Sequence, residues 1–161
     1  MLRIFTLVLI WSFVFMPKSE AQELADQVRE SFQGVESIHV KGAFCKVDIQ
    51  PATGRTVELD GELRSVRRVD GLKIHYALKN GLLDVWIEQP ARITGQLKGY
   101  LSFEVPPGIS IKVENVSGEV KVLGVGGENT ILETVSGGIV AENIPANLQA
   151  KSVSGSIKTN T

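Results

Sequence analysis

A short unit recurs three times in the C-terminal third of the chain, and this repeat constrains the fold more than any other feature. Each copy ends in a valine-serine-glycine motif, and the serines Ser117, Ser136 and Ser154 are 19 and 18 residues apart. Self-similarity at a nearly fixed period is typical of proteins built from stacked coils. The repeat therefore predicts that residues 109–161 wind into regular turns.

Branched aliphatic residues recur within these copies and predict the core of the coils. One turn alone cannot offset the ordering of its backbone, which costs about 1 to 2 kcal/mol per residue, so neighbouring turns must stack. Burial of each aliphatic side chain contributes roughly 1.5 to 3 kcal/mol. Gly118, Gly137 and Gly155 suit corners where a Cβ would clash or where φ is positive. We expect inward-pointing columns made of Val116, Val120, Val122, Val135, Ile139, Val153 and Ile157.

Alternation of apolar and polar residues predicts short, half-buried strands in the first half of the chain, between residues 35 and 63. Residues 72–78 and 82–87 predict a hairpin, because the Asn80-Gly81 pair readily adopts the positive φ values of a tight turn. Residues 88–99 are typical of a long loop. A further strand is expected over residues 100–105, where Pro106, Pro107 and Gly108 end it.

The first 21 residues have the three parts of a secretory signal peptide. Arg3 precedes an apolar run of about a dozen residues, which ends in a small-residue pattern that predicts cleavage after Ala21. The run is shorter than the roughly 20 residues that cross a bilayer. We therefore expect an exported protein, either periplasmic, on the cell surface or secreted, with no transmembrane segment in the mature chain.

The residues that follow the signal peptide have a different spacing. Leu24, Val28 and Phe32 recur at steps of four, and Gly34 comes directly after them. This pattern predicts a short amphipathic helix over residues 22–34 that leads into the strands.

Charge and cysteine content exclude several function classes. Residues 22–161 contain 15 Lys and Arg against 17 Asp and Glu, so the mature protein is nearly neutral. This balance gives no electrostatic basis for binding nucleic acid. Cys45 is the only cysteine and cannot form an intrachain disulfide. Stability must therefore come from packing.

The order of several short motifs resembles a known bacterial family. The motifs are residues 32–40, residues 42–47, the stretch Gly99 to Pro106, and the repeated valine-serine-glycine units. Together they resemble the putative adhesin domain, a β-helical domain of unknown function in exported and envelope proteins. The resemblance implies a right-handed β-solenoid with no established catalytic residues.

These observations predict an all-β protein with a β-helix-like architecture. The signal peptide occupies residues 1–21, the lead-in helix residues 22–34, and a single β-solenoid domain residues 35–161. Its repeats are clearest in residues 109–161. Because the last copy of the repeat is incomplete, we expect an unpaired strand edge there.

The repeats lack the residues that catalysis or calcium binding needs. No Asp, His or Cys follows Asp84, whereas a calcium-binding solenoid needs aspartates in each repeat. A polysaccharide-cleaving enzyme needs clustered carboxylates. Residues 124–127 lack the Lys-Ser/Thr ending of a phosphate-binding loop. We expect outward, solvated side chains at Glu114, Glu119, Glu128, Glu133 and Glu142.

The first half of the chain offers few further candidates. His39 and His75 lie at polar positions of alternating strands and could share a metal if these strands are adjacent, but no third metal ligand shows a recognisable spacing. Cys45 is expected to be a small buried or half-buried side chain. The basic cluster at Arg64, Arg67 and Arg68 is typical of a solvated loop. The sequence therefore predicts no catalytic, cofactor-binding or metal-binding residue and no cofactor.

Three function hypotheses follow. The first is a non-enzymatic exported protein that presents a flat, hydrogen-bonding surface to an envelope protein or a glycan. The second is a self-assembling unit that pairs through its open end by strand addition. The third is a glycan-active enzyme, which would depend on Asp84, Glu114 or Glu119.

Overall fold

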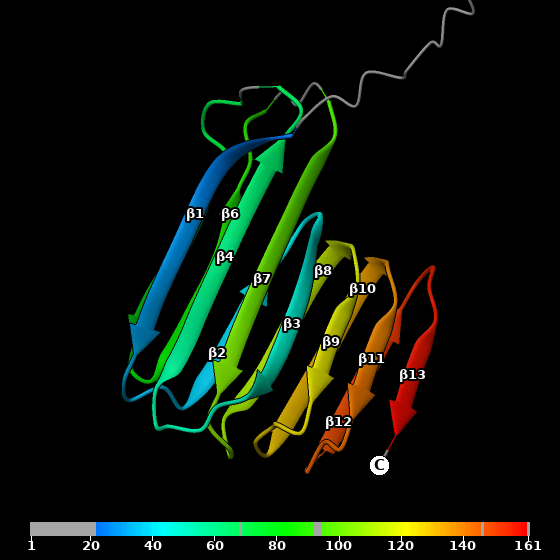
Figure 1. The fold of residues 1–161 in the computed structure, drawn as a ribbon. Coiled ribbons are helices and arrows are strands. Elements are labelled where there is room, and N and C mark those ends of the chain that lie inside the picture. Colours follow the sequence, from blue (N-terminus) through cyan, green and yellow to red (C-terminus); the bar gives the residue numbers. More distant parts are fainter. Residues whose placement is uncertain (1–21, 68, 92–94, 146, 161) are drawn as a thin grey trace, which may run out of the picture.

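Two β-sheets packed face to face form the protein, as the computed structural model shows (Figure 1). The structure describes residues 22–67, 69–91, 95–145 and 147–160, and all regular elements in these ranges are strands. The seven-stranded sheet contains, in spatial order, β1 (Glu23–Phe32), β4 (Val57–Ser65), β7 (Leu97–Val105), β3 (Cys45–Pro51), β9 (Val120–Leu123), β11 (Ile139–Glu142) and β13 (Ile157–Asn160). The six-stranded sheet contains β12 (Asn147–Ser152), β10 (Asn129–Ser136), β8 (Ser110–Ser117), β2 (Ser37–Lys41), β6 (Leu82–Glu88) and β5 (Lys73–Lys79).

This sandwich-like arrangement shows that the predicted β-solenoid is wrong. The C-terminal strands pair in parallel: β10 lies between β8 and β12 in one sheet, and β11 lies between β9 and β13 in the other. β2 and β3 continue this parallel pairing with β8 and β9. The other N-terminal strands depart from it, because β4 pairs antiparallel with both β1 and β7, and β5 pairs antiparallel with β6. Both sheets are therefore mixed, and the chain as a whole does not form a β-helix.

The predicted inward columns are only partly correct. Val120, Val122 and Ile139 are fully buried, whereas Val116, Val135 and Val153 are 54%, 50% and 73% exposed. The period of two explains the difference, because the buried Ile111, Val113 and Asn115 of β8 direct the next residue, Val116, outward. Ile157 is also exposed.

The segment predicted as a lead-in helix is strand β1. A step of four residues is also a multiple of two, so Val28 and Phe32 can lie on one face of a strand as well as on one face of a helix. Both side chains pack against the core. β1 pairs antiparallel with β4 along its whole length, and a bulge interrupts the register between Leu24 and Asp26.

β1 also contacts β5, the edge strand of the other sheet. The Asp26 carboxylate accepts a hydrogen bond of 2.8 Å from the Ile74 backbone N–H, and the Tyr76 hydroxyl donates one of 2.9 Å to Glu30. The rings of Phe32 and Tyr76 meet edge to face with centroids 5.3 Å apart. These contacts, here called the β1–β5 clasp, close one side of the sandwich.

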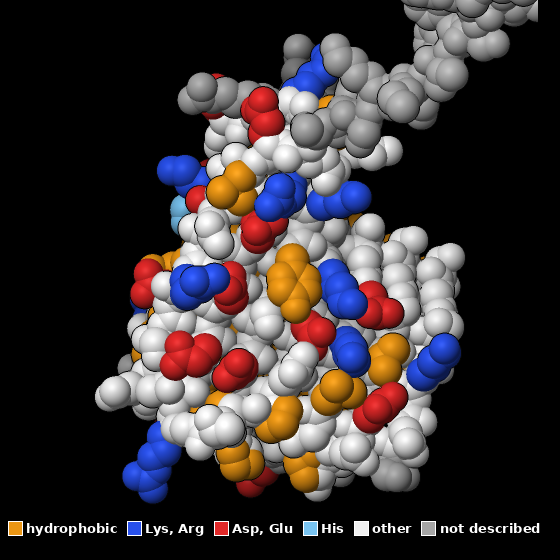
Figure 2. Space-filling model, viewed as in Figure 1, with side chains coloured by type: hydrophobic (Ala, Val, Ile, Leu, Met, Phe, Trp, Pro, Cys, Tyr) orange, Lys and Arg blue, Asp and Glu red, His pale blue; other side chains and the backbone are white. Residues whose placement is uncertain are grey.

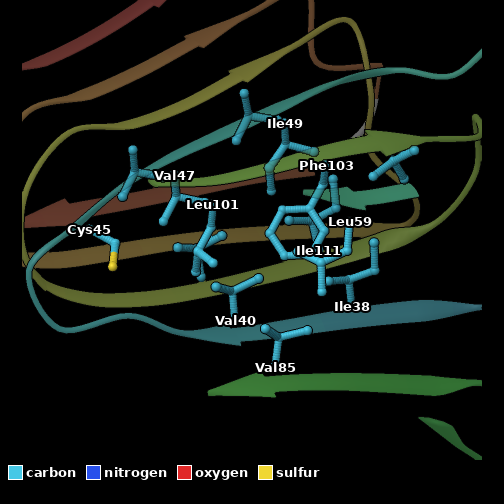
Figure 3. Packing of buried hydrophobic residues seen from close by; sticks show 14 of the residues in the cluster. Ile38, Val40, Cys45, Val47, Ile49, Leu59, Val85, Leu101, Phe103 and Ile111 are labelled. Carbon is cyan, nitrogen blue, oxygen red and sulfur yellow. The ribbon is translucent and has the colours of Figure 1, made fainter. Parts of the chain in front are cut away.

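The predicted hairpin and the later strand are confirmed. β5 and β6 pair antiparallel around Asn80 and Gly81, whose φ values are 50° and 77°. β7 ends at Val105, and Gly108 follows with a φ of 87°. Figure 3 shows side chains of both sheets meeting in the core, where Val40 comes from β2 and Phe103 from β7.

The predicted signal peptide lies outside the described residues. Within the part of the chain that the structure describes, no helix has the length and apolar character that membrane crossing requires.

Candidate binding surface

The outer face of the six-stranded sheet carries a cluster of ionic side chains centred on His39. The sheet register places Asp84 of β6 and Lys112 of β8 directly beside His39 of β2. Nε2 of His39 lies 2.6 Å from Glu114 Oε2, and Nδ1 lies 3.4 Å from Asp84 Oδ1. The two carboxylates therefore approach different ring nitrogens of one imidazole, which suits side-chain hydrogen bonding more than a shared metal site.

Two lysines complete this His39 cluster. Lys41 Nζ lies 3.3 Å from Asp84, and Lys112 Nζ lies 2.9 Å from Glu114. The hydrogen bond from Lys112, followed by that from His39, lowers the pKa of Glu114. A general acid needs a pKa near the working pH, so Glu114 is suited to binding rather than to proton donation.

His75 belongs to a separate contact at the β5 edge of the same face. Its ring stacks on Trp86 with centroids 5.4 Å apart, and its Nε2 lies 2.5 Å from Glu88 Oε2. β6 lies between the strands of His75 and His39, so the fold does not bring the two histidines together. Among the described residues, no group of three or more His, Cys, Asp or Glu is placed to hold a metal ion.

Beside the His39 cluster runs a shallow groove with one apolar wall, here called the valine groove. Its volume is about 340 Å³. The apolar wall consists of Val116, Val135 and Val153. The parallel register of β8, β10 and β12 places these valines at equivalent positions of successive repeats, which are called rungs below. The neighbouring row of lining side chains, largely on the same strands, is ionic and is called the ionic wall. It consists of Lys41, Glu114, Glu133 and Lys151.

The floor of the valine groove is held by a buried amide. The Asn115 Nδ2 group donates hydrogen bonds of 2.8 Å to the Cys45 carbonyl and 3.0 Å to the Ser117 carbonyl. A Cβ at Gly42, the residue directly after β2, would collide with Asn115 Oδ1, so glycine is needed for the chain to pass this close. The floor is therefore fixed by packing and hydrogen bonds before any ligand binds.

Sequence reasoning missed this groove because it assigned the three valines to the core. One signal was present in the sequence. Strict alternation through Ile111, Val113 and Asn115 predicts an outward side chain at Val116, but the aliphatic repeat was given more weight.

The structure brings two acids of the enzyme hypothesis, Asp84 and Glu114, to the same histidine and separates the third, Glu119, from them. Asp84 and Glu114 belong to the six-stranded sheet, whereas Glu119 precedes β9 and pairs at 3.1 Å with Lys46 of the seven-stranded sheet. Figure 2 shows the outer face of that sheet, where acidic and basic side chains are interspersed. The fold therefore does not bring all three carboxylates into one site.

The remaining described candidate residues from the sequence are buried or are engaged in contacts within the protein. Cys45 is fully buried as expected, and burial raises the pKa of its thiol to about 12, which makes it a poor nucleophile. Arg64 pairs with Glu62, and the Arg67 backbone N–H donates to the Ser65 hydroxyl. Arg68 lies outside the described residues. Residues 124–127 form an irregular link between β9 and β10.

Comparisons with known proteins give distant structural neighbours. No protein-family model and no curated protein matches the sequence. A putative cell adhesion protein from Clostridium sporogenes is 11% identical, with 84% of this chain and 99% of that chain covered and a TM-score of 0.45. A putative adhesin from Bacteroides fragilis is 12% identical, with 84% of this chain and 97% of that chain covered and a TM-score of 0.32. A putative lipid binding protein from Parabacteroides distasonis is 9% identical, with 79% of this chain and 63% of that chain covered and a TM-score of 0.33. The first two names match the adhesin family that the sequence resembles.

Proposed function

We propose that this chain is an exported, non-enzymatic binding protein whose valine groove binds a glycan or a protein of the cell envelope. One observation carries the proposal: Val116, Val135 and Val153 are aligned and exposed beside an ionic wall. Contiguous exposed apolar side chains rimmed by polar ones mark interaction sites on soluble proteins.

The two walls have different roles in this proposal. Complete burial of a valine side chain contributes roughly 1.5 to 3 kcal/mol, so covering the apolar wall supplies affinity. Glu133 and Lys151 of the ionic wall have no ion pair within 4 Å among the described residues. Their free charges would provide hydrogen-bonding specificity toward the ligand.

The ionic groups around the groove favour binding over catalysis. His39, Asp84 and Glu114 are engaged with one another or with lysines. The lowered pKa of Glu114 keeps this carboxylate ionised at neutral pH. The thiol of Cys45 is fully buried and is not exposed to a ligand in the groove.

Binding can be tested with residues 22–161 in co-sedimentation with purified envelope fragments and on a glycan array. We expect saturable binding that Val135→Asp weakens by about tenfold or more, because a charge replaces a buried apolar contact. Val140→Asp is the matched control, since Val140 lies on the outer face of β11 in the other sheet. Equal binding by Val135→Asp and wild type would refute the role of the groove.

The export part of the proposal needs its own experiment. The full chain and a variant that starts at residue 22 are expressed in a bacterial host, and the cells are fractionated. We expect the full chain to reach the periplasm or the medium with residues 1–21 removed, as mass spectrometry would detect. Retention of uncleaved protein in the cytoplasm would contradict export.

A further inference from the structure

The ionic wall of the valine groove belongs to a longer row of side chains that crosses the six-stranded sheet. Each member is the register partner of the next, from β12 through β10, β8, β2 and β6 to β5. This cross-strand row consists of Lys151, Glu133, Glu114, Lys41, Trp86 and His75. Neighbouring strands lie about 4.7 to 4.9 Å apart, so the row spans roughly 24 Å.

The end of the row on β6 and β5 is aromatic. Trp86 alternates with the buried Leu83 and Val85 of β6, so its side chain points outward. It is partly exposed, and its ring stacks on that of His75 with centroids 5.4 Å apart. Neither residue lines the valine groove. The row therefore connects the groove to a second, aromatic surface on the same face of the sheet.

The spacing of the row fits a chain of sugar rings better than a polypeptide. Successive members are one strand spacing apart, about 4.8 Å. In an extended polypeptide the side chains on one face repeat every two residues, at about 6.6 to 6.8 Å, so they fall out of step with the row. In an extended glycan each pyranose ring advances by close to one strand spacing. Each ring can therefore meet one member of the row.

The charges of the ionic wall favour a neutral ligand. Its four members are two lysines and two glutamates, so the wall selects neither a polyanion nor a polycation. Sugar hydroxyls suit both signs, because a hydroxyl can donate to a carboxylate and accept from an ammonium group. Glu133 and Lys151 have no ion pair within 4 Å among the described residues, which leaves both available for such bonds.

The apolar wall adds a requirement that hydroxyl groups alone do not meet. Val116, Val135 and Val153 run beside the ionic wall, one on each of three successive rungs. Covering all three calls for an apolar group that recurs along the ligand. The acetamido methyl groups of N-acetylated sugars are such groups, and they leave the chain neutral.

We propose that the valine groove and the Trp86–His75 pair together bind one neutral, extended chain of N-acetylated sugars that lies across the strands. The proposal rests on the proposed function and specifies its ligand. The acetamido methyl groups contact the apolar wall, and ring hydroxyls bond to Glu133 and Lys151. A ring farther along the chain packs on the exposed part of the Trp86 indole, which only a chain longer than the groove can reach.

The test measures the binding of three oligosaccharides to residues 22–161 by isothermal titration calorimetry. Chitotriose and chitohexaose are neutral chains of N-acetylglucosamine that differ in length, and cellohexaose matches the longer chain without acetamido groups. We expect chitohexaose to bind about tenfold or more tightly than either of the others, because it alone reaches both apolar surfaces. Equal affinity for chitohexaose and either other sugar would overturn the proposal.

Matched variants assign the aromatic end of the site. Trp86→Ala should weaken chitohexaose about tenfold and leave chitotriose unchanged, because a trimer seated on β8, β10 and β12 does not reach β6. Trp86→Phe should keep most of the affinity, since it keeps a ring. Tyr100→Ala is the control, because Tyr100 is an exposed aromatic residue of the other sheet. Unchanged chitohexaose binding by Trp86→Ala would refute the longer site.

Binding to envelope fragments separates this proposal from that of the groove itself. If chitohexaose does not bind but the fragments still bind in a Val135-dependent manner, the sugar chain is refuted and the groove stands. Binding that protease treatment of the fragments abolishes would identify a protein ligand and refute the sugar chain in the same way. Absence of binding to both would refute both proposals.

Discussion

The carboxylate of Asp26 accepts a hydrogen bond from the backbone N–H of Ile74 at 2.8 Å, which joins the edges of two different sheets. Residues 26 and 74 are 48 positions apart in the chain. The contact gives the N–H of an edge strand an acceptor that no neighbouring strand supplies. The β1–β5 clasp therefore includes a backbone-to-side-chain hydrogen bond between the two sheets in addition to packing contacts.

Substitution Asp26→Ala is expected to lower the free energy of unfolding by about 1 to 3 kcal/mol, because the partly buried Ile74 N–H loses its acceptor. Urea denaturation measures the loss. Asp26→Asn is the control, since its amide oxygen can still accept the bond, and it should cost less. Faster hydrogen exchange at the Ile74 amide in the alanine variant would locate the effect. Unchanged stability of that variant would show that the clasp is not important for folding.

The corners of the parallel rungs depend on stacked glycines. A Cβ at Gly137 would collide with the Gly118 carbonyl oxygen, whereas one at Gly138 would find its nearest neighbour, Ser156 Oγ, at 3.6 Å. We expect Gly137→Ala to lower the free energy of unfolding by about 2 kcal/mol or more, because backbone must move. Gly138→Ala should be tolerated in the same thermal or urea unfolding measurement. Similar losses for both would contradict the stacked-corner explanation.

The sequence predicted those structural elements that are determined by residues close together in the chain. The Asn80-Gly81 hairpin was found because the turn residues determine their own φ values. The alternating strands were found because one face of each is buried. The assignment of β1 failed because a spacing of four fits both a helix and a strand. Its pairing with β4, 25 to 42 residues away in register, is a long-range contact that no local pattern reveals.

The candidate site was less predictable than the strands. The repeat correctly placed Ser117 beside Ser136, which are register partners. It did not show that Asn115 takes the inward position and turns Val116 toward solvent. The clustering of His39 with Asp84 and Glu114 depends on the order β6-β2-β8. This order is set by packing between distant segments, so the composition of the strands could not reveal it.

Replacement of Asn115 by a residue with a hydroxyl group should destabilise the protein less than replacement by a residue with a carboxylate. Its Nδ2 donates to the carbonyls of Cys45 and Ser117, and Asn115→Asp would direct a buried negative charge at these acceptors. We expect a loss of about 3 kcal/mol or more in the free energy of unfolding. Asn115→Thr is the control, because Thr134 is its register partner on the next rung. Stability that is equal in the two variants at neutral pH would contradict the donor role of the amide.

Cys45 should make stability fall at alkaline pH. Burial, as the largest cause, raises the pKa of its thiol from 9.0 to about 12. The unfolded chain therefore releases the proton near pH 9, while the folded protein keeps it until about pH 12. The stabilisation is complete below pH 9 and is lost as pH rises through this window, by at most about 1.4 kcal/mol per pH unit.

Urea denaturation of the wild type and of Cys45→Ala between pH 8 and 10.5 isolates this effect, because lysines and tyrosines titrate in both proteins. We expect the stability difference between them to be constant up to about pH 9 and then to change steadily in favour of the alanine variant. In the folded wild type, iodoacetamide should react with Cys45 only as fast as the protein opens, since the thiol is fully buried. Parallel pH profiles, or rapid labelling of the folded protein, would show that the thiol is accessible and ionises normally.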